Sequence, residues 1–475
     1  MSCKWFLLGV IAVMLMGGCN CSHYIDDYGA IPHSDTIDAQ MANSLALQKA
    51  IAAANSSSDK TVVIPKRSYY LFSVWTTNVS NLHLMVLGKL IASKSVKHWP
   101  HYPNSTSFLE FMMFVYCDNL TISGGGSIDG RGYHWWTLVL LNDKRYIDGA
   151  DDRPHLMHLV RCRNTTIHDL KLKNSPFFHI KMDDCQKALI YNLDIKVNTT
   201  AQLNLLKHFS LEGVIPMFPF NTDGIDPHGT DMHIFNLTVQ NWDDVVVPKP
   251  GSKGDLYGNC TENFLVENCT VRLGVGMSIG SIAPSDSVRC IRNVTFRNVE
   301  MSNPLKGIYI KTNPGNSGHS IVSNIVYENF SMQRPIWWAV YIGPQQMKEP
   351  DRGGPGCMLY PFDPKGTCST QPLVTVQNIT LRNIAIRNSV LYPVTIRCNV
   401  SNPCRWFEFD NVTTDKWSIG QKETGVVCEY VSGRQSGTHP QIPCFYDGLQ
   451  EYESEPLEPN SGTETLTAEL IWREL

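Results

Sequence analysis

One short phrase recurs along most of the chain, and it constrains the fold more than any other feature. Each copy begins with Asn, continues with alternating apolar and polar residues, and reaches a second Asn. Clear copies start at Asn263, Asn293, Asn324 and Asn378. The copies follow one another at roughly 20 to 30 residues, with some longer gaps, which is the repeat length of stacked supersecondary units.

Asn at these positions indicates how the copies stack. It tolerates a left-handed bend between two short strands, and its side-chain amide can stack on the Asn of the next copy. We therefore predict an all-β chain folded as a parallel β-helix, in which each coil buries apolar side chains against its neighbours. A β-propeller would need four strands per repeat and Trp-Asp or Gly-His signals, which these repeats lack.

The repeat also indicates the domain organisation. A chain of 475 residues could hold two or three average domains, but a solenoid can grow by adding coils. We predict a single domain over residues 21–445, with an insertion at about 335–372 where Pro- and Gly-rich sequence breaks the repeat. A helical pattern from about Ala39 to Ala54 is expected to cover the first coil, or else to be an ordinary surface helix. The acidic residues 446–475 are expected to be a disordered tail.

The N-terminus has the composition of a secretory signal. Lys4 is followed by an apolar run from Phe6 to Met16 and by Gly17-Gly18-Cys19, which predicts a signal peptide over residues 1–20. Cleavage as a bacterial lipoprotein is the alternative. No later stretch has the roughly 18 to 20 consecutive apolar residues that span a bilayer. We expect a secreted protein that does not contact the membrane once the signal is removed.

Two further features agree with export. Asn-x-Ser/Thr sequons recur along the chain and suggest a glycoprotein, although the Asn-rich repeat itself generates some of them. Among the 15 cysteines are close pairs that predict disulfides, namely Cys357/Cys368, Cys398/Cys404 and Cys428/Cys444. Zinc binding would need paired Cys or His at ligand spacing, and none is present. The net charge of −4, with no basic block, argues against nucleic acid as a partner.

Between residues 220 and 250 acidic side chains gather beside Gly, Asn and Pro. Asp223 and the pair Asp243/Asp244 are about one repeat apart, so on stacked coils they should lie on one face, separated by about 4.8 Å plus side-chain reach. Carboxylates so close raise at least one pKa, which leaves one group protonated as an acid while another stays ionised. Inverting hydrolysis of a glycoside uses such a pair about 6.5 to 9.5 Å apart, with a water between base and sugar. Turn aspartates, or ligands for Ca²⁺, are the alternatives.

The order of the motifs resembles glycoside hydrolase family 28, the polygalacturonase family of right-handed parallel β-helix enzymes. Its signatures run Asn-Thr-Asp, Asp-Asp, Gly-His-Gly and Arg-Ile-Lys. Asn221-Thr222-Asp223 and Asp243-Asp244 match the first two. The resemblance implies that Asp243 is the general acid and that Asp223 and Asp244 activate the attacking water. It covers the chain from about Tyr28 to Cys444.

The last two signatures are altered. Val275 stands where the family has His, and Tyr309 stands where the family has the Arg that grips a uronate carboxylate, while Lys311 is retained. Arg is the preferred bidentate partner of a carboxylate, and Tyr cannot replace its charge. The rhamnogalacturonan hydrolases of the same family also lack this His and Arg. We expect hydrolysis of a pectin-type or other acidic polysaccharide, of plant or algal type, by a monomer without cofactor or metal.

Further substrate contacts are expected from Asn221, Asp226, Tyr309, Lys311 and His228. Several neighbours could serve the site or only the structure: Lys249 and Lys253, which we expect to be merely solvated, and Trp337 and Trp338, which could stack on sugars or pack beneath a loop. Two other classes of function stay open. A polysaccharide lyase would use the carboxylates to hold Ca²⁺, and a non-catalytic carbohydrate-binding protein would follow if the two losses abolish activity.

Overall fold

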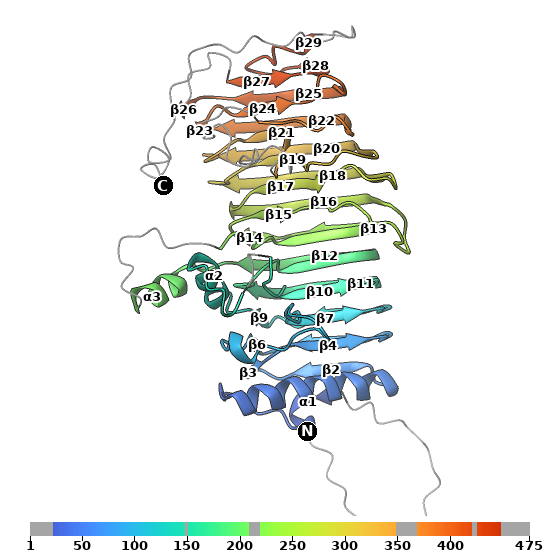
Figure 1. Ribbon diagram of the computed structural model, residues 1–475, viewed down its shortest axis with the longest axis vertical. Coiled ribbons are helices and arrows are strands. Elements are labelled where there is room, and N and C mark those ends of the chain that lie inside the picture. The colour runs from blue at the N-terminus through green and yellow to red at the C-terminus, as the bar shows by residue number, and fades with distance from the viewer. Residues whose placement is uncertain (1–21, 148–150, 209–218, 348–367, 420–424, 448–475) are drawn as a thin grey trace, which may run out of the picture.

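The computed structural model describes residues 22–147, 151–208, 219–347, 368–419 and 425–447. Within these ranges, one sheet of 27 strands contains every strand except two, and the strand pairs within it are parallel. The strands lie one above another in successive coils from the N-terminal end to the C-terminal end (Figure 1). This confirms the predicted all-β parallel β-helix.

Each coil contributes strands to three faces of the stack. The first face contains β1 (His23–Tyr24), β2 (Thr61–Ile64), β5 (His83–Val86), β8 (Thr121–Ser123), β11 (Arg163–Lys173), β12 (Ile180–Lys196), β13 (Ile225–Phe235), β16 (Cys260–Leu273), β18 (Arg289–Ser302), β20 (Ser320–Gln333), β22 (Val374–Arg387), β25 (Cys404–Thr414), β28 (Val431–Ser436) and β29 (Tyr446–Asp447). The second face contains β3 (Ser68–Leu71), β6 (Lys89–Ala92), β9 (Ser127–Asp129), β14 (Thr238–Gln240) and the later parts of the long strands.

The third face is the one that carries the acidic motifs. It contains β4 (Val74–Thr77), β7 (Met112–Val115), β10 (Met157–Val160), the first parts of β12 and β13, β15 (Asp244–Val246), β17 (Gly276–Ile282), β19 (Ile308–Thr312), β21 (Val340–Gln345), β24 (Val394–Arg397) and β27 (Val426–Glu429). A separate two-stranded sheet pairs β23 (Ser389–Leu391) with β26 (Trp417–Ile419).

The Asn residues of the repeat form two ladders at the bends of the coils. Each of these Asn residues has a positive φ. Within a ladder, the side-chain amide of one Asn donates to the side-chain oxygen of the Asn one coil before. One ladder joins Asn378 to Asn324 (2.6 Å), Asn324 to Asn293 (3.0 Å) and Asn293 to Asn263 (3.3 Å). The other joins Asn383 to Asn329 (3.0 Å), Asn329 to Asn298 (3.0 Å) and Asn298 to Asn268 (3.1 Å). The predicted stacking of Asn is therefore confirmed.

Alternation along the strands fills the interior of the coils. Val266, Phe296, Tyr327 and Leu381 occupy equivalent places on successive coils and are fully buried. Their neighbours in sequence point outward, which explains why the repeat alternates apolar and polar residues.

The N-terminal end of this interior is covered by helix α1 (Ile37–Ser56), as Figure 1 shows. The Thr36 hydroxyl caps α1 by accepting from the Ala39 amide, and Leu47, Ala50 and Ile51 are buried against the first coil. The predicted capping helix is confirmed and extends slightly beyond Ala39–Ala54. The shorter helices are η1 (Ile25–Tyr28), η2 (Val96–His98), α2 (Tyr133–Leu140) and α3 (Thr200–His208), of which α2 and α3 contact each other.

Two expected boundaries differ from the structure. β21, inside the expected insertion at 335–372, pairs with β19 and β24 and is therefore part of the regular stack. β29 pairs with β28, so the stack reaches residue 447, inside the range expected to be a tail. The expected signal peptide over residues 1–20, residues 348–367 and residues 448–475 lie outside the described residues, and so does Cys357. No helix in the described part of the chain has the length and apolarity needed to cross a membrane.

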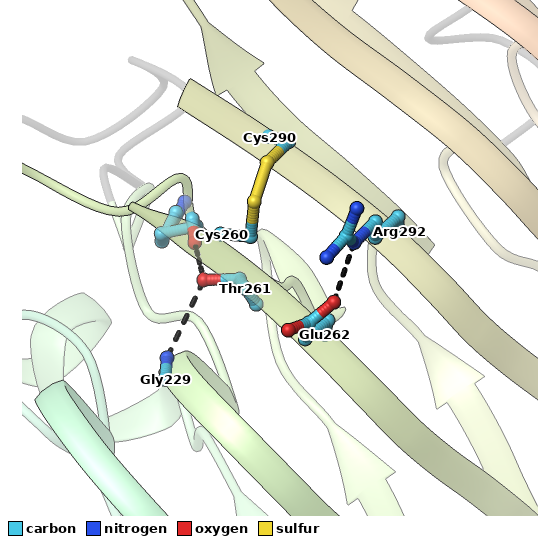
Figure 2. Close-up of a disulfide and its surroundings, with 7 residues drawn as sticks. Gly229, Cys260, Thr261, Glu262, Cys290 and Arg292 are labelled. Carbon is cyan, nitrogen blue, oxygen red and sulfur yellow. Dashed lines mark hydrogen bonds and ion pairs between the residues drawn. A yellow bond between two sulfur atoms is a disulfide. The ribbon is translucent and has the colours of Figure 1, made fainter. Parts of the chain in front are cut away.

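Three disulfides lie within the described residues. Cys398–Cys404 and Cys428–Cys444 were predicted, whereas Cys260–Cys290 was not, because its members are 30 residues apart in sequence. Figure 2 shows that Cys260 and Cys290 join two neighbouring coils, where β16 pairs with β18. The hydroxyl of the adjacent Thr261 accepts from the Gly229 amide (3.3 Å) and donates to the Lys249 carbonyl (2.6 Å). These bonds connect the strand that carries Cys260 to the loop that carries Lys249.

Candidate active site

Asp223, Asp243 and Asp244 meet on the third face. The Gly224 amide donates to the Asp244 carbonyl at 2.8 Å, so Asp223 and Asp244 lie on neighbouring coils, as the repeat predicts. Each of the three side chains offers a carboxylate oxygen, and these oxygens lie within 4.8 Å of one another. These oxygens are closer together than the carboxyl separation of about 6.5 to 9.5 Å that we expected for an inverting pair.

The three carboxylates differ in exposure and in charge. Asp223 and Asp244 are buried, with 2% and 0% of their surface exposed, while Asp243 is partly exposed. Burial, together with the neighbouring Asp226, Asp243 and Asp244, raises the pKa of Asp223 well above its usual range. Burial and the Asp244 carboxylate also raise the pKa of Asp243. Asp243 is therefore the member of the trio that combines a raised pKa with partial exposure to a ligand.

Asp244 is the ionised member of the trio. Burial alone would raise its pKa, but Lys311 and Lys249 outweigh this effect and hold the pKa below its usual range. Lys311 Nζ contacts Asp244 Oδ2, and the Ser278 hydroxyl donates to Asp244 Oδ1. Ser278 lies on β17 and Lys311 on β19, the next two coils. Their neighbours Met277 and Ile310 point into the coil interior, so Ser278 and Lys311 point outward to Asp244.

Backbone and amide contacts hold the trio in place. The Asn221 amide donates to Asp243 Oδ2 at 2.9 Å, and the Asn221 side chain accepts from Arg153 at 2.9 Å. Asn241 donates to the Thr222 and Asp244 carbonyls at 3.0 and 2.7 Å. Asn221, predicted to contact the substrate, holds the Asp243 carboxylate in this structure, and its contact with a substrate stays a prediction. Arg153 and Asn241 had no motif that could have identified them.

Lys249 belongs to the site, contrary to the expectation that it is merely solvated. Its Nζ lies 3.1 Å from Asp226 Oδ2 and 4.0 Å from Asp223 Oδ2, and its side chain is 28% exposed. Burial raises the pKa of Asp226 to about 6, although Lys249 opposes this shift. Lys253, four residues on, is exposed, as expected. A lysine beside buried carboxylates cannot be told from a solvated one by sequence, because the contact depends on how neighbouring coils stack.

His228 is held by a second network on the N-terminal side of the trio. Its Nε2 lies 2.9 Å from Asp255, and its Nδ1 accepts from the Asp184 amide at 3.2 Å. The same side contains a buried group of Glu110, His155 and His158, in which His155 Nδ1 lies 2.9 Å from Glu110 and His158 Nε2 lies 2.7 Å from Asp183. His228 is thus separate from the trio, and its predicted contact with substrate stays a prediction.

Among the residues that the structure describes, two side-chain groups have metal-ligand spacing, namely the acidic trio and Glu110 with His155 and His158. In the trio the positive charge that Ca²⁺ would bring is supplied by Lys311 and Lys249. In the other group the Glu110 carboxylate already accepts from the His155 amide and contacts both imidazoles. Protein groups therefore engage several of these ligand atoms, while Asp223 Oδ1, His155 Nε2 and His158 Nδ1 have no hydrogen-bond partner among the described residues.

The two altered positions lie on the C-terminal side of the trio. The Val275 amide donates to the Asp243 carbonyl at 2.7 Å, so Val275 is adjacent to the acid. Tyr309 and Lys311 point to the same side of β19, and Tyr309 is only 2% exposed. Trp338 is buried and stacks on Tyr341 with ring centroids 4.5 Å apart. Of the two earlier possibilities for Trp338, packing beneath other residues is the one observed.

Comparisons with known proteins agree with this arrangement. A model described as Glycosyl hydrolases family 28 matches residues 55–351, well over half of the chain. A polygalacturonase of Persea americana is 26% identical over 412 residues, which cover 86% of this chain and 76% of that protein. A probable endo-xylogalacturonan hydrolase A of Aspergillus fumigatus is 30% identical over 295 residues, or 61% of this chain and 64% of that protein.

One solved structure shows the likeness of fold. An exopolygalacturonase from Thermotoga maritima superposes with a TM-score of 0.61 at 17% identity. The superposition covers 90% of this chain and 92% of that one.

Proposed function

This chain belongs to glycosyl hydrolase family 28, and from that membership we propose that it hydrolyses a pectic polysaccharide, with Asp243 as acid and Asp223 and Asp244 activating water. The difference in exposure within the trio carries the proposal. Only Asp243 is exposed enough to touch a sugar, whereas Asp223 and Asp244 are buried behind it. A buried carboxylate cannot attack the anomeric carbon directly, so a water must act between the carboxylates and the sugar.

The proposed reaction is a single displacement. In this step Asp243, whose pKa is raised by burial and by Asp244, acts in its protonated form and gives its proton to the glycosidic oxygen as the bond from that oxygen to the anomeric carbon breaks. Water bonds to the anomeric carbon, and its proton passes to the ionised Asp244. Asp223 Oδ1, which is buried without a hydrogen-bond partner in the described part of the chain, orients this water. The anomeric configuration is inverted, because attack and departure occur on opposite faces.

Membership of family 28 supports a pectic substrate, and two residues favour a variant of it. Polygalacturonase activity on homogalacturonan is the first candidate, because a polygalacturonase is among the relatives. Tyr309 and Val275 favour a second candidate, in which the polymer departs from plain homogalacturonan, as in rhamnogalacturonan or xylogalacturonan. Tyr at position 309 removes the guanidinium that would bind a uronate bidentately.

Release of reducing ends from homogalacturonan, rhamnogalacturonan and xylogalacturonan tests the proposal. The parent protein should release sugar from at least one polymer, and Asp243→Asn should lower that rate by about 10² to 10⁴-fold without changing the melting temperature. Equal rates for parent and variant on every polymer would reject the hydrolase. Proton NMR of the first product should detect the inverted anomer, and a retained anomer would reject the single displacement.

We also propose that the protein is secreted as a monomer. Its disulfides support an oxidising compartment. N-terminal sequencing of protein recovered from the culture medium should give a start near residue 20, and light scattering should give the mass of one chain. An intact N-terminus inside the cell would contradict secretion.

A further inference from the structure

Lys306 is a buried cation with no assigned role. Only 5% of its surface is exposed, and its Nζ lies over three aromatic rings, 3.9 Å from the centroid of Tyr309, 4.9 Å from Tyr341 and 6.0 Å from Trp338. These rings belong to a hydrophobic cluster that is separate from the interior of the coils. Desolvating an ammonium group is costly, so a lysine kept in such a place requires an explanation.

The position of Lys306 relates it to the two altered signatures. β17 pairs with β19 so that Met277 lies beside Ile308, and Val275, just before β17, packs against the cluster that contains Tyr309. The Leu305 amide donates to the Gly274 carbonyl at 2.7 Å, which fixes the approach of the two coils. Lys306 therefore lies over the ring of Tyr309, which replaces the family Arg, and Val275, which replaces the family His, packs against the same cluster.

Two lysines share the Tyr309 ring, but only one has a partner carboxylate. Lys311 Nζ lies 5.1 Å from the ring centroid and is paired with Asp244. Lys306 has ring contacts only, with no ion pair or hydrogen bond in the described part of the chain. The buried Tyr309 hydroxyl likewise has no hydrogen-bond partner among the described residues. A free ammonium and a free hydroxyl beside Asp243 together match the needs of a carboxylate.

We propose that Lys306 determines specificity by binding the carboxylate of an acidic sugar over the Tyr309 ring. The inference rests on the proposed function, because it assumes that a uronate-containing polymer lies across Asp243. The Tyr309 hydroxyl donates a second hydrogen bond to the same carboxylate, while the buried Tyr309 ring holds the Lys306 ammonium in place. Lys306 with Tyr309 thus takes the place of the missing guanidinium, and Lys311 stays with Asp244.

The charge state of Lys306 gives the subsite a pH dependence. Burial and the nearby Lys311 lower the pKa of Lys306 to about 7, against the opposing pull of Asp244 and Asp243. The ionisable groups around it are thus Lys311, Asp243, Asp244 and the phenols of Tyr309 and Tyr341. A raised pH removes the proton from Lys306, so preference for an acidic sugar should decline as pH rises through about 7.

The test is a binding measurement that does not require turnover. Trigalacturonate and its carboxyl-reduced counterpart are titrated calorimetrically into Asp243→Asn protein, with and without Lys306→Met. Loss of Lys306 should raise the Kd for trigalacturonate by about tenfold or more, because one charge-assisted hydrogen bond is lost. The Kd for the carboxyl-reduced sugar should change by no more than about twofold. Lys306→Arg should restore most of the preference, and the exposed Lys416→Met should change neither ligand.

Several outcomes reject the proposal. Equal losses of affinity for the two ligands would show that Lys306 has only a structural role. Stronger binding of the reduced sugar than of trigalacturonate by the protein with Lys306 intact would show that the aromatic rings around Lys306 bind a neutral sugar. Lys306→Gln replaces the Met variant if the latter does not melt cooperatively. Failure of the parent to hydrolyse any polymer, with the Lys306-dependent preference intact, would reject the proposed function alone. Hydrolysis by the parent with unchanged binding by the Lys306 variants would reject this inference alone.

Discussion

Lys311 Nζ contacts Asp244 Oδ2, although the two residues are 67 positions apart in sequence and both side chains are almost fully buried. A buried cation beside a buried carboxylate offsets the cost of desolvating each group, and it keeps Asp244 ionised. Lys311 was expected to contact the sugar. In the structure it acts first on the trio, as the counter-ion that lowers the pKa of Asp244 beside two aspartates whose pKa values are raised.

Removing one member of this pair should be costly. Lys311→Met leaves Asp244 as an uncompensated buried charge, so we expect the free energy of unfolding to fall by about 3–5 kcal/mol. Denaturant unfolding checks this. Arg292→Met, which removes the more exposed partner of Glu262 on the surface, is the control and should cost at most about 1 kcal/mol. Similar decreases in the free energy of unfolding for both variants would show that the buried pair contributes no more to stability than the exposed pair.

Lys249 should set the acid limit of activity. Its charge lowers the pKa values of Asp226 and Asp244, so Lys249→Met should raise both. Because Asp244 must be ionised, activity is lost as pH falls through its pKa, and a raised pKa moves that loss to higher pH. The pH profile of kcat/KM measures this limit. Lys253→Met, at an exposed lysine of the same loop, should leave the profile unchanged, and a shift of equal size there would contradict the assignment.

One rung of an Asn ladder can be removed at Asn298, which donates to Asn268 and accepts from Asn329. Asn298 has φ 56°, so Ala there loses the hydrogen bonds and also adopts a left-handed conformation. We expect Asn298→Ala to lower the free energy of unfolding by about 2 kcal/mol. Asn298→Gly avoids the conformational cost and should lose about half as much. Thermal or urea unfolding of the two variants separates the loss of the hydrogen bonds from the cost of the left-handed conformation. Equal decreases in the free energy of unfolding would contradict a conformational cost for Ala.

The Cys260–Cys290 disulfide closes a loop of 30 residues. Replacing both cysteines with Ser should lower the free energy of unfolding by about 3 kcal/mol, as expected for a loop of this length. The Thr261 hydroxyl next to Cys260 donates to the Lys249 carbonyl, so loss of the disulfide should also loosen the position of Lys249. The acid limb of the kcat/KM profile should then become broader. Replacing Cys398 and Cys404, which close a loop of 6 residues, should cost less. The opposite ranking in denaturant unfolding would contradict the loop-length argument.

The fold could be predicted because its signal is local. An Asn at each bend and alternation between bends are properties of a few consecutive residues, and they repeat at each coil. Asp223 and Asp244 could also be placed on neighbouring coils, because the repeat length converts sequence distance into stacking. The disulfide Cys260–Cys290 follows the same stacking, but 15 cysteines allow too many pairings for sequence to select it.

By itself, the sequence determined the coiled scaffold, the capping helix and the three aspartates that face one another. Only the tertiary structure decided which charges those aspartates carry. Asp243 and Asp244 are neighbours of identical chemistry, yet one is partly exposed and the other is buried against Lys311. Lys249 and Lys306 likewise acquire their surroundings from other coils. A carboxylate or ammonium takes its pKa and its accessibility from groups distant in sequence, because electrostatic energy and desolvation depend on distances in space.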